Sequence, residues 1–181
     1  MSVNSGMFSS ARDDWETPDD LFTELNAEFG FTLDVCATKA NAKCARFISP
    51  EQDALHMRWG RGEVCWMNPP YGRQIGWWMD KACGEAAVGR NCVVCLVPAR
   101  TDTYWWHTYA MTGEIRFLRG RVRFKGAKSG APFPSAVVIF DGRSGRQMAK
   151  PIKRRRQKPK PKPSAGGRSD PGRLRRGAVT K

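Results

Sequence analysis

Three short apolar runs, each bounded by polar or turn-forming residues, constrain the fold of this 181-residue chain more than any other feature. They are "EVCWM" at 63–67, "NCVVCLVP" at 91–98 and "SAVVIF" at 135–140. Runs of this length without polar alternation are typical of strands that are covered on both faces of a sheet. They therefore predict three strands, and the strands at 91–98 and 135–140 are expected to be buried.

Helical patterns alternate with these strands. Residues 17–30 carry a helix signature in which Thr17 is the cap, Pro18 suits the first turn and Gly30 ends the helix. Further helices are expected at 73–87 and 101–111, further strands at 31–35 and 45–49, and a hairpin over 114–124. This order predicts an α/β fold whose sheet is mostly parallel and finishes in an antiparallel C-terminal addition.

The six cysteines do not form a metal-binding pattern. Only Cys92 and Cys95 make a CxxC pair, and they lie in an apolar run where residues three apart point to opposite faces of a strand. The only histidines are His56 and His107. The sequence therefore predicts buried, reduced thiols and no metal site.

The net charge of +14 is confined to one end of the chain. Residues 1–141 hold 16 basic and 16 acidic residues, whereas residues 142–181 hold 15 basic residues and one acid. The tail is rich in Lys, Arg, Pro and Gly, a composition that cannot bury enough apolar surface to fold. We expect a flexible N-terminus at 1–12, a globular domain at 13–142 and a disordered tail at 143–181. The tail is expected to bind nucleic acid electrostatically, and an address signal or a solubility extension is the alternative.

Apolar residues are also too dispersed for a membrane segment. No stretch approaches the roughly 20 apolar residues of a membrane span. The first residues contain no apolar run of the kind found in a secretory signal. We therefore expect a protein without a membrane partner that works in the cytoplasm.

The strand at 63–67 ends on the tetrapeptide Asn68-Pro69-Pro70-Tyr71. Proline cannot donate to a sheet ladder, so the two prolines end the strand and stiffen the corner. The Asn68 side-chain oxygen and the Pro69 carbonyl are then placed to accept both hydrogens of an amino group on a nucleobase. This directs the nitrogen lone pair at an electrophile, while Tyr71 is expected to offer a flat face for base stacking. A plain strand-terminating turn is the structural alternative.

Asp34 lies near the end of the expected strand at 31–35, and one further strand is expected between it and the strand before Asn68. Ligands of open α/β sheets bind at the carboxyl ends of the strands. A carboxylate in that position can neutralise an ammonium group or accept hydrogen bonds from ribose hydroxyls, although it can also cap a helix. The sequence therefore predicts that Asp34 and Asn68 face one crevice.

These residues and their neighbours resemble a known family. "NPPY" resembles the catalytic motif of methyltransferases that modify amino groups with S-adenosylmethionine. Together, "DWETPDDLFTELNAEFGFTLDVCAT", "MNPPYG", "LVPARTDTYWWH" and "FPSAVVIF" resemble the phage-type DNA N-6-adenine methyltransferases. The resemblance covers residues 13–140 and implies a Rossmann-like methyltransferase fold that flips adenine out of double-stranded DNA.

The resemblance also implies cofactor contacts. The segment "DVCATKAN" departs from the family pattern because no glycine-rich loop follows the strand. Trp15, Thr17 and Pro18 would border the methionine part of S-adenosylmethionine, Asp34 would be the acid of the first cofactor motif, and Asp53 would add a second contact.

Basic residues in two segments are candidates for DNA contacts. The expected hairpin region, "EIRFLRGRVRFKGAK", carries six basic residues against one acid, and Arg119, Arg121 and Arg123 would contact phosphates. Arg100, just after the strand at 91–98, is a further candidate at the rim of the crevice. A solvated sheet face is the alternative for the hairpin.

The sequence as a whole predicts a DNA adenine-N6 methyltransferase encoded by a phage or prophage, whose mark would protect DNA from restriction or regulate genes. Cytosine-N4 methylation and methylation of a protein glutamine use similar proline-rich corners and remain alternatives. A non-catalytic DNA-binding protein that keeps the fold is the alternative from another class.

Overall fold

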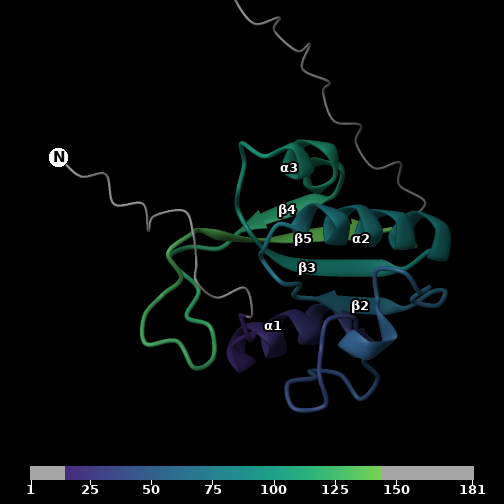
Figure 1. Cartoon of the computed structure of the whole chain (residues 1–181), viewed down its shortest axis with the longest axis horizontal. Coiled ribbons are helices and arrows are strands. Elements are labelled where there is room, and N and C mark those ends of the chain that lie inside the picture. The colour runs from purple at the N-terminus through teal and green to yellow at the C-terminus, as the bar shows by residue number, and fades with distance from the viewer. Residues whose placement is uncertain (1–14, 144–181) are drawn as a thin grey trace, which may run out of the picture.

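A five-stranded sheet forms the centre of the molecule in a computed structural model that describes residues 15–143 (Figure 1). The order of the strands across the sheet is β1-β2-β3-β5-β4. The strands are β1 (Leu33–Asp34), β2 (Val64–Met67), β3 (Cys92–Pro98), β4 (Glu114–Phe117) and β5 (Ser135–Asp141).

Four of these five strands run in the same direction. β1, β2 and β3 are parallel, and β5 lies antiparallel between β3 and β4. The predicted α/β fold, with a mostly parallel sheet and an antiparallel C-terminal addition, is confirmed at this level.

The three apolar runs of the sequence form the buried centre of the sheet. Every residue of β2 and β3 is buried, and so is every residue of β5 before Asp141. Cys92 and Cys95 lie in β3 as buried free thiols, as predicted. The core therefore follows directly from the unbroken hydrophobicity of these runs.

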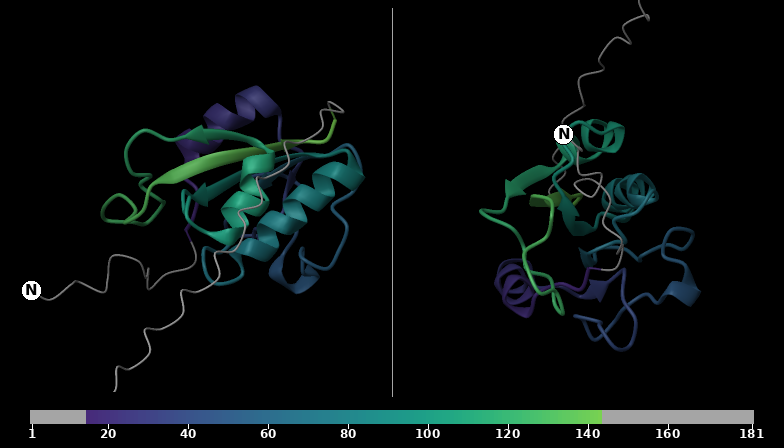
Figure 2. Two further views of the ribbon diagram at one scale, coloured as in Figure 1. Left: turned by 90° about the horizontal axis from the view of Figure 1, so that it is seen from above. Right: turned by 60° about the vertical axis from the view of Figure 1, so that its left-hand side comes forward.

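Helices cover both faces of the sheet, with α1 (Asp19–Phe29) on one face and α2 (Ile75–Gly89) and α3 (Tyr104–Thr108) on the other (Figure 2). Phe22 of α1 meets Trp66 of β2 edge-on, with 5.6 Å between ring centroids. Two 3-10 turns, η2 (Pro50–Gln52) and η3 (Ala110–Thr112), complete the described elements. Across residues 15–143, no helix is both long and apolar enough to cross a membrane.

The first helix ends as predicted but begins differently. Gly30 closes α1 in the left-handed conformation, with φ of 68°, which glycine adopts without steric cost. At the other end Pro18 is the cap residue, and no side chain caps the helix. The prediction that Thr17 caps this helix is wrong, because its hydroxyl is engaged by Asn68.

The predicted hairpin over 114–124 is also wrong. β4 ends at Phe117 and pairs with β5, so residues 118–134 form a long loop rather than a second strand. Inside this loop Ala131 donates a backbone hydrogen bond to Val122, and Phe124 is buried. Phe124 packs against residues far away in the sequence, and this packing takes the place of the predicted pairing between two neighbouring strands.

Two other elements are shorter than expected. The strand predicted at 45–49 is reduced to one parallel bridge between Phe47 and Asp34. The helix predicted at 101–111 is divided into α3 and the turn η3. The predictions for residues 1–12 and for the tail beyond Arg143 fall outside the described residues.

Candidate functional site

The carboxyl ends of β1 and β2 place Asp34 and Asn68 at one edge of the sheet. β1 ends at Asp34, which stands beside Trp66 in the register, and Asn68 follows the last residue of β2. The two strands are direct neighbours in the sheet, and the strand expected between them in sequence, at 45–49, is reduced to the single bridge from Phe47 to Asp34. Asp34 and Asn68 line the same cavity of about 190 Å³, which we call the small cavity.

A larger cavity of about 810 Å³ adjoins the small one, and Cys36, Asn41 and Pro70 line both. Its walls come from the loop after β1, from the segment around η2 and from the beginning of α2. Besides the three shared residues, the walls include Val35, Ile48, Asp53, His56, Trp77 and Trp78. The volume lies within the range of about 300–1,000 Å³ that is typical of small-molecule sites.

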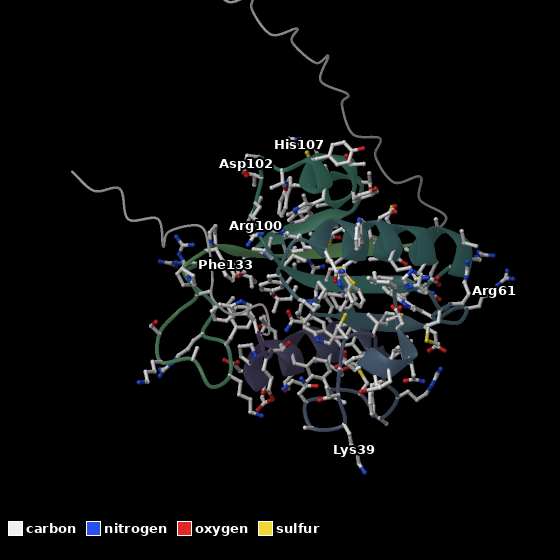
Figure 3. The ribbon with its side chains drawn as sticks, viewed as in Figure 1. Lys39, Arg61, Arg100, Asp102, His107 and Phe133 are labelled. Atoms are coloured by element: carbon white, nitrogen blue, oxygen red, sulfur yellow. The ribbon has the colours of Figure 1, made fainter. Side chains whose placement is uncertain are left out.

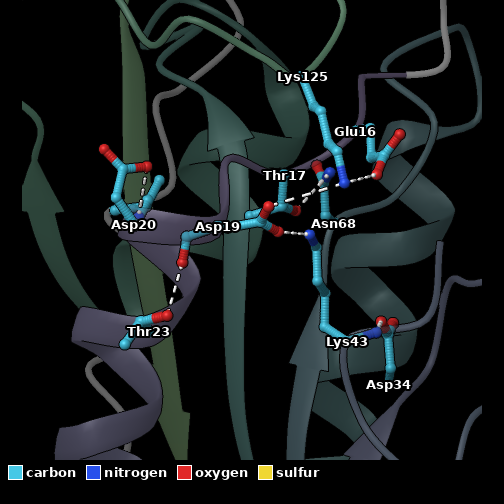
Figure 4. Close-up of polar contacts among 10 residues, drawn as sticks. Glu16, Thr17, Asp19, Asp20, Thr23, Asp34, Lys43, Asn68 and Lys125 are labelled. Carbon is cyan, nitrogen blue, oxygen red and sulfur yellow. Dashed lines mark hydrogen bonds and ion pairs between the residues drawn. The ribbon is translucent and has the colours of Figure 1, made fainter.

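The Asn68 side chain is held on both sides by hydrogen bonds, and Figure 4 shows the one to Thr17. Its Nδ2 donates to the Trp15 carbonyl and, at 3.0 Å, to the Thr17 hydroxyl. Its Oδ1 accepts a bond of 2.7 Å from the Tyr71 hydroxyl. The Pro69 carbonyl accepts no hydrogen bond from any residue that the structure describes. The corner thus presents two oxygen acceptors on a rigid strand end.

Tyr71 lies differently from its expected place. Tyr71 is 1% exposed, and its ring packs edge-on against Phe124 and Phe133, with centroid distances of 5.9 and 5.6 Å. The expectation of an open ring face for base stacking is therefore wrong for this structure, because the loop 118–134 covers that face. Burial raises the pKa of Tyr71 well above its ordinary value, which keeps the hydroxyl protonated. Its single hydrogen is within reach of two acceptors, Asn68 Oδ1 at 2.7 Å and the Leu96 carbonyl at 3.1 Å, and the contact to Asn68 is the shorter one.

Asp34 is buried and serves the loop that follows it. Its Oδ1 accepts from the backbone N–H of Cys36 at 3.2 Å, and its Oδ2 accepts from that of Lys43 at 3.0 Å. Burial raises the pKa of this carboxyl above its ordinary value of 3.8, although these hydrogen bonds oppose the shift. Asp34 therefore fixes the loop 35–43 at the edge of the cavity and also places a carboxylate there.

The segment before α1 lies over Asn68. Trp15 and Thr17 line the small cavity, and the Trp15 indole packs against Phe124 at 5.1 Å. Pro18 follows as the cap of α1 and is partly buried. Trp15 and Thr17 therefore lie beside Asn68, and this position does not test the cofactor contacts that the resemblance implied.

An ion-pair cluster joins three segments at the mouth of the small cavity (Figure 4). Lys43 pairs with Asp19, and Lys125 lies 3.3 Å from Glu16 and 3.7 Å from Asp19. The hydrogen bond from Lys43, and then its positive charge, lowers the pKa of Asp19. The backbone N–H of Lys125 also donates to the Glu16 carbonyl at 2.9 Å. The loop 118–134 is thereby attached to the segment that contacts Asn68.

Asp53 lies apart from Asp34, in the wall of the large cavity. It stands at the end of η2 with φ of 53°, and its Oδ2 is 2.6 Å from Nδ1 of His56. Its side chain is 54% exposed. The structure therefore brings Asp34 to the small cavity and Asp53 to the large one.

The candidate DNA-binding arginines fall on two surfaces. Arg119, Arg121 and Arg123 are exposed on the loop 118–134, whereas Arg100 is partly buried just after β3 (Figure 3). Arg116, from the same basic region, is paired with Glu28 at 2.6 Å and is not available to phosphates in this arrangement.

The described cysteines do not supply a nucleophile. All six are free, and burial raises the pKa of every thiol above its ordinary value of 9.0. They are therefore neutral near pH 7. Within residues 15–143, no group of three or more His, Cys, Asp and Glu side chains could hold a metal ion.

Sequence reasoning missed the side chains that close the site. The side chains of Lys43 and Lys125 pair with Glu16 and Asp19, which lie far away in the sequence, and no local pattern indicated these pairs. Trp78 of the large cavity lies in a helical run, and its sequence pattern indicated only that it packs in the core. Phe133 opens the segment "FPSAVVIF", and its place in a stretch that carried the family resemblance was the only available signal.

The comparisons with known proteins agree with this geometry. A family profile described as "DNA N-6-adenine-methyltransferase (Dam)" matches residues 4–153. The chain is 34% identical over 150 residues to a protein of Haemophilus phage HP1 named DNA N-6-adenine-methyltransferase, covering 78% of this chain and 86% of that protein. It is also 34% identical over 98 residues to a protein of the same name from Escherichia phage T1, covering 54% of this chain and 40% of that protein.

The profile match extends over most of the chain, and it includes the segment over Asn68, both strand ends and the loop 118–134. The match to the protein of phage HP1 likewise covers more than two thirds of each sequence. This chain belongs to the DNA N-6-adenine-methyltransferase (Dam) family.

Proposed function

We propose that the protein transfers a methyl group from S-adenosylmethionine to the N6 amino group of adenine in DNA. The observation that carries the proposal is the Asn68–Pro69 corner at the end of β2, where two oxygen acceptors border a cavity at the carboxyl edge of the sheet. Family membership supports adenine in DNA as the substrate and implies a methyl donor.

The corner suits an amino group whose lone pair is delocalised into an aromatic ring. The Asn68 Oδ1 and the Pro69 carbonyl would accept its two N–H bonds, which localises the lone pair on nitrogen. This is stabilisation by preorganised dipoles and needs no general base. The neutral thiols and the protonated Tyr71 nearby agree with a site that works without a strong base.

The large cavity fits S-adenosylmethionine in size and in the chemistry of its walls. It is lined by Trp77, by Trp78 and by the carboxylate-bearing Asp53, and the buried Trp78 Nε1 has no hydrogen-bond partner among the described residues. When bound, the cofactor would supply the methyl electrophile. The resemblance assigns Trp15, Thr17 and Pro18 to the methionine end, and Trp15 and Thr17 contact Asn68. Asp34, the acid of the first cofactor motif, lines the small cavity with Asn68.

Adenine in a duplex must leave the helix to reach this corner. Phe124 and Phe133 cover Tyr71 in the structure, so a flipped base that stacks on Tyr71 would have to displace the loop 118–134. The same loop carries Arg119, Arg121 and Arg123, which would contact phosphates of that DNA.

The DNA partner is also supported by the position of the charge. The residues before 142 carry no formal net charge, whereas the tail carries 15 basic residues and one acid. If roughly half of these charges release counterions, removing residues 144–181 makes the log–log salt slope of DNA binding shallower by about 6. Equal slopes for the full and truncated chains would remove the tail from the DNA interface and favour an address or solubility role.

Nucleoside analysis tests the proposed reaction. The full chain is incubated with unmethylated duplex DNA and S-adenosylmethionine carrying a labelled methyl group, and the DNA is digested to nucleosides. Label in N6-methyldeoxyadenosine supports the proposal, whereas label in N4-methyldeoxycytidine would assign the cytosine alternative. Labelled protein glutamine, or cofactor and DNA binding without transfer, would assign one of the other two alternatives.

A further inference from the structure

The hydrogen bonds of the Asn68 side chain determine which end of its amide faces the substrate. The Trp15 carbonyl and the Thr17 hydroxyl both lie at Nδ2, so the two N–H bonds of the amide are directed at the segment before α1. The Tyr71 hydroxyl lies at Oδ1 on the other side. The amide is therefore held at both ends.

Only one orientation of this amide satisfies its neighbours. A carbonyl oxygen can accept but cannot donate, so the atom of Asn68 that faces Trp15 must be the nitrogen. A rotated amide would place two acceptor oxygens together and leave buried groups unpaired, which is costly. Oδ1 is consequently the atom left to accept a hydrogen from a substrate amino group.

Thr17 has no other role within the described contacts. It is 3% exposed, it does not cap α1, and its side chain makes one described hydrogen bond, to Asn68 at 3.0 Å. We propose that Thr17, with the main-chain carbonyl of Trp15, is a positioning residue that fixes the Asn68 amide so that Oδ1 faces the substrate. The inference rests on the proposed function, because it assumes that Asn68 is the acceptor in methyl transfer.

This arrangement also explains why the corner begins with an amide rather than a carboxylate. An aspartate at position 68 keeps the acceptor for the substrate but has no N–H for the Trp15 carbonyl. Two oxygens would then face each other in a partly buried site. Asn68→Asp is therefore expected to lower kcat at least a hundredfold, although the substitution preserves shape and an acceptor oxygen.

The experiment compares Thr17→Val, which removes the hydroxyl at nearly constant volume, with Thr17→Ser, which keeps it. The kcat and KM for DNA are measured on the full chain, and the Kd for S-adenosylmethionine is measured by calorimetry. We expect Thr17→Val to lower kcat by about three- to tenfold, the effect of one hydrogen bond, with Kd and KM changed less than about twofold. Thr17→Ser is expected to keep the wild-type kcat, because it keeps the hydroxyl.

A spectroscopic measurement follows the amide without using activity. The side-chain NH₂ signals of Asn68 are assigned in ¹H–¹⁵N spectra by their loss in Asn68→Ala. Thr17→Val is expected to move one of the two proton signals upfield, and Thr17→Ser is expected to leave both in place. This measurement still decides the positioning role if the wild-type protein makes no N6-methyladenine, a result that would contradict only the proposed function.

Three results would overturn the inference. One is a weaker affinity for S-adenosylmethionine in Thr17→Val with kcat unchanged, which would make Thr17 a cofactor contact. Another is unchanged Asn68 NH₂ signals in a folded Thr17→Val protein. The third is substantial turnover by Asn68→Asp, which a carboxylate facing the Trp15 carbonyl should not allow.

Discussion

The two cavities at the edge of the sheet differ in size and in the segments that form them. The small cavity, of about 190 Å³, lies where the segment before α1 meets the end of β2. The large cavity, of about 810 Å³, is formed by the loop after β1, the region of η2 and the start of α2. The small one is too small for a whole nucleoside cofactor, whereas the large one has the size of a typical ligand site.

This difference indicates a division of roles. Asn68 of the small cavity is held by hydrogen bonds that fix its orientation, as a group acting on a transition state requires. The residues of the large cavity provide surface and a few polar groups, as binding requires. Asp34 belongs to the small cavity but shares its loop with the large one, so it connects the two.

The largest expected effect tests the small cavity. Asn68→Ala should lower kcat by about 10²–10³, because one preorganised acceptor is lost in the transition state. The Kd for S-adenosylmethionine should change less than about twofold if binding belongs to the large cavity. Single-turnover rates with radiolabelled cofactor, with calorimetry as the control, measure both. Nearly normal turnover would end the assignment of Asn68 as the acceptor.

The second prediction tests the residue that connects the cavities. Asp34→Ala should weaken S-adenosylmethionine binding by about 1.5–3 kcal/mol, the usual range for a hydrogen bond to a charged group. Calorimetry measures the change, and thermal unfolding confirms that the variant is folded. The matched control is Asp102→Ala, since Asp102 is exposed and lines neither cavity. Unchanged affinity in folded Asp34→Ala would reduce Asp34 to the support of the loop 35–43.

The raised pKa of Asp34 gives a pH dependence of known sign. Both an ammonium and a hydroxyl donor prefer the ionised carboxylate, so cofactor affinity should fall as the pH drops through the raised pKa. The fall should approach tenfold per pH unit below that pKa. It should begin at a higher pH than an ordinary aspartate with a pKa of 3.8 would allow.

The raised pKa of Asp34 has the opposite effect on folding stability, which should increase as the pH falls. Between pH 3.8 and the raised pKa, the folded protein holds a proton on Asp34 that the unfolded chain has lost. The free energy of unfolding therefore gains a contribution as the pH falls through this window, and that contribution is lost as the pH rises. Asp34→Ala should remove both dependences in calorimetric and denaturant titrations. Identical pH profiles in the two proteins would contradict the assignment.

The sequence predicted the strands and their ends better than it predicted the loop 118–134. The apolar runs predicted the buried strands, and the strand-end rule correctly placed Asp34 and Asn68 at one edge, because both depend on local pattern. The basic run at 118–124 alternates as a strand would, yet Phe124 packs on Trp15 and Tyr71 instead of pairing. Such a choice depends on partners distant in sequence, and a local pattern contains no information about them.

A smaller effect on kcat is expected at Tyr71, where either the hydroxyl or the ring could matter to the small cavity. Tyr71→Phe keeps the ring but removes the donor that lies 2.7 Å from Asn68 Oδ1. Loss of one neutral hydrogen bond, about 0.5–1.5 kcal/mol, should lower kcat by about two- to tenfold. The matched control is Tyr104→Phe, since Tyr104 is 79% exposed and should not affect kcat. Wild-type kcat in Tyr71→Phe would indicate that the ring, rather than the hydroxyl, matters.

The smallest expected effect concerns the large cavity. Asp53 lines its wall with a side chain that is 54% exposed, so water screens any contact with a cofactor. Asp53→Asn removes the charge while tolerating the left-handed backbone at this position, where φ is 53°. We expect S-adenosylmethionine to bind less tightly by about 0.2–1 kcal/mol, which is at most about fivefold.

A matched control distinguishes that contact from a general charge effect. Glu51→Gln removes one charge from the same turn, but Glu51 lines neither cavity, so its cofactor affinity should equal that of the wild type. An equal loss in both variants would indicate long-range electrostatics, which added salt should weaken, because charges farther apart than the Debye length of about 8–10 Å are largely screened. A loss in Asp53→Asn as large as that in Asp34→Ala would reverse the order of the two carboxylates. The principal polar anchor of the cofactor would then belong to the large cavity, and Asp34 would act mainly by holding the loop that joins the two.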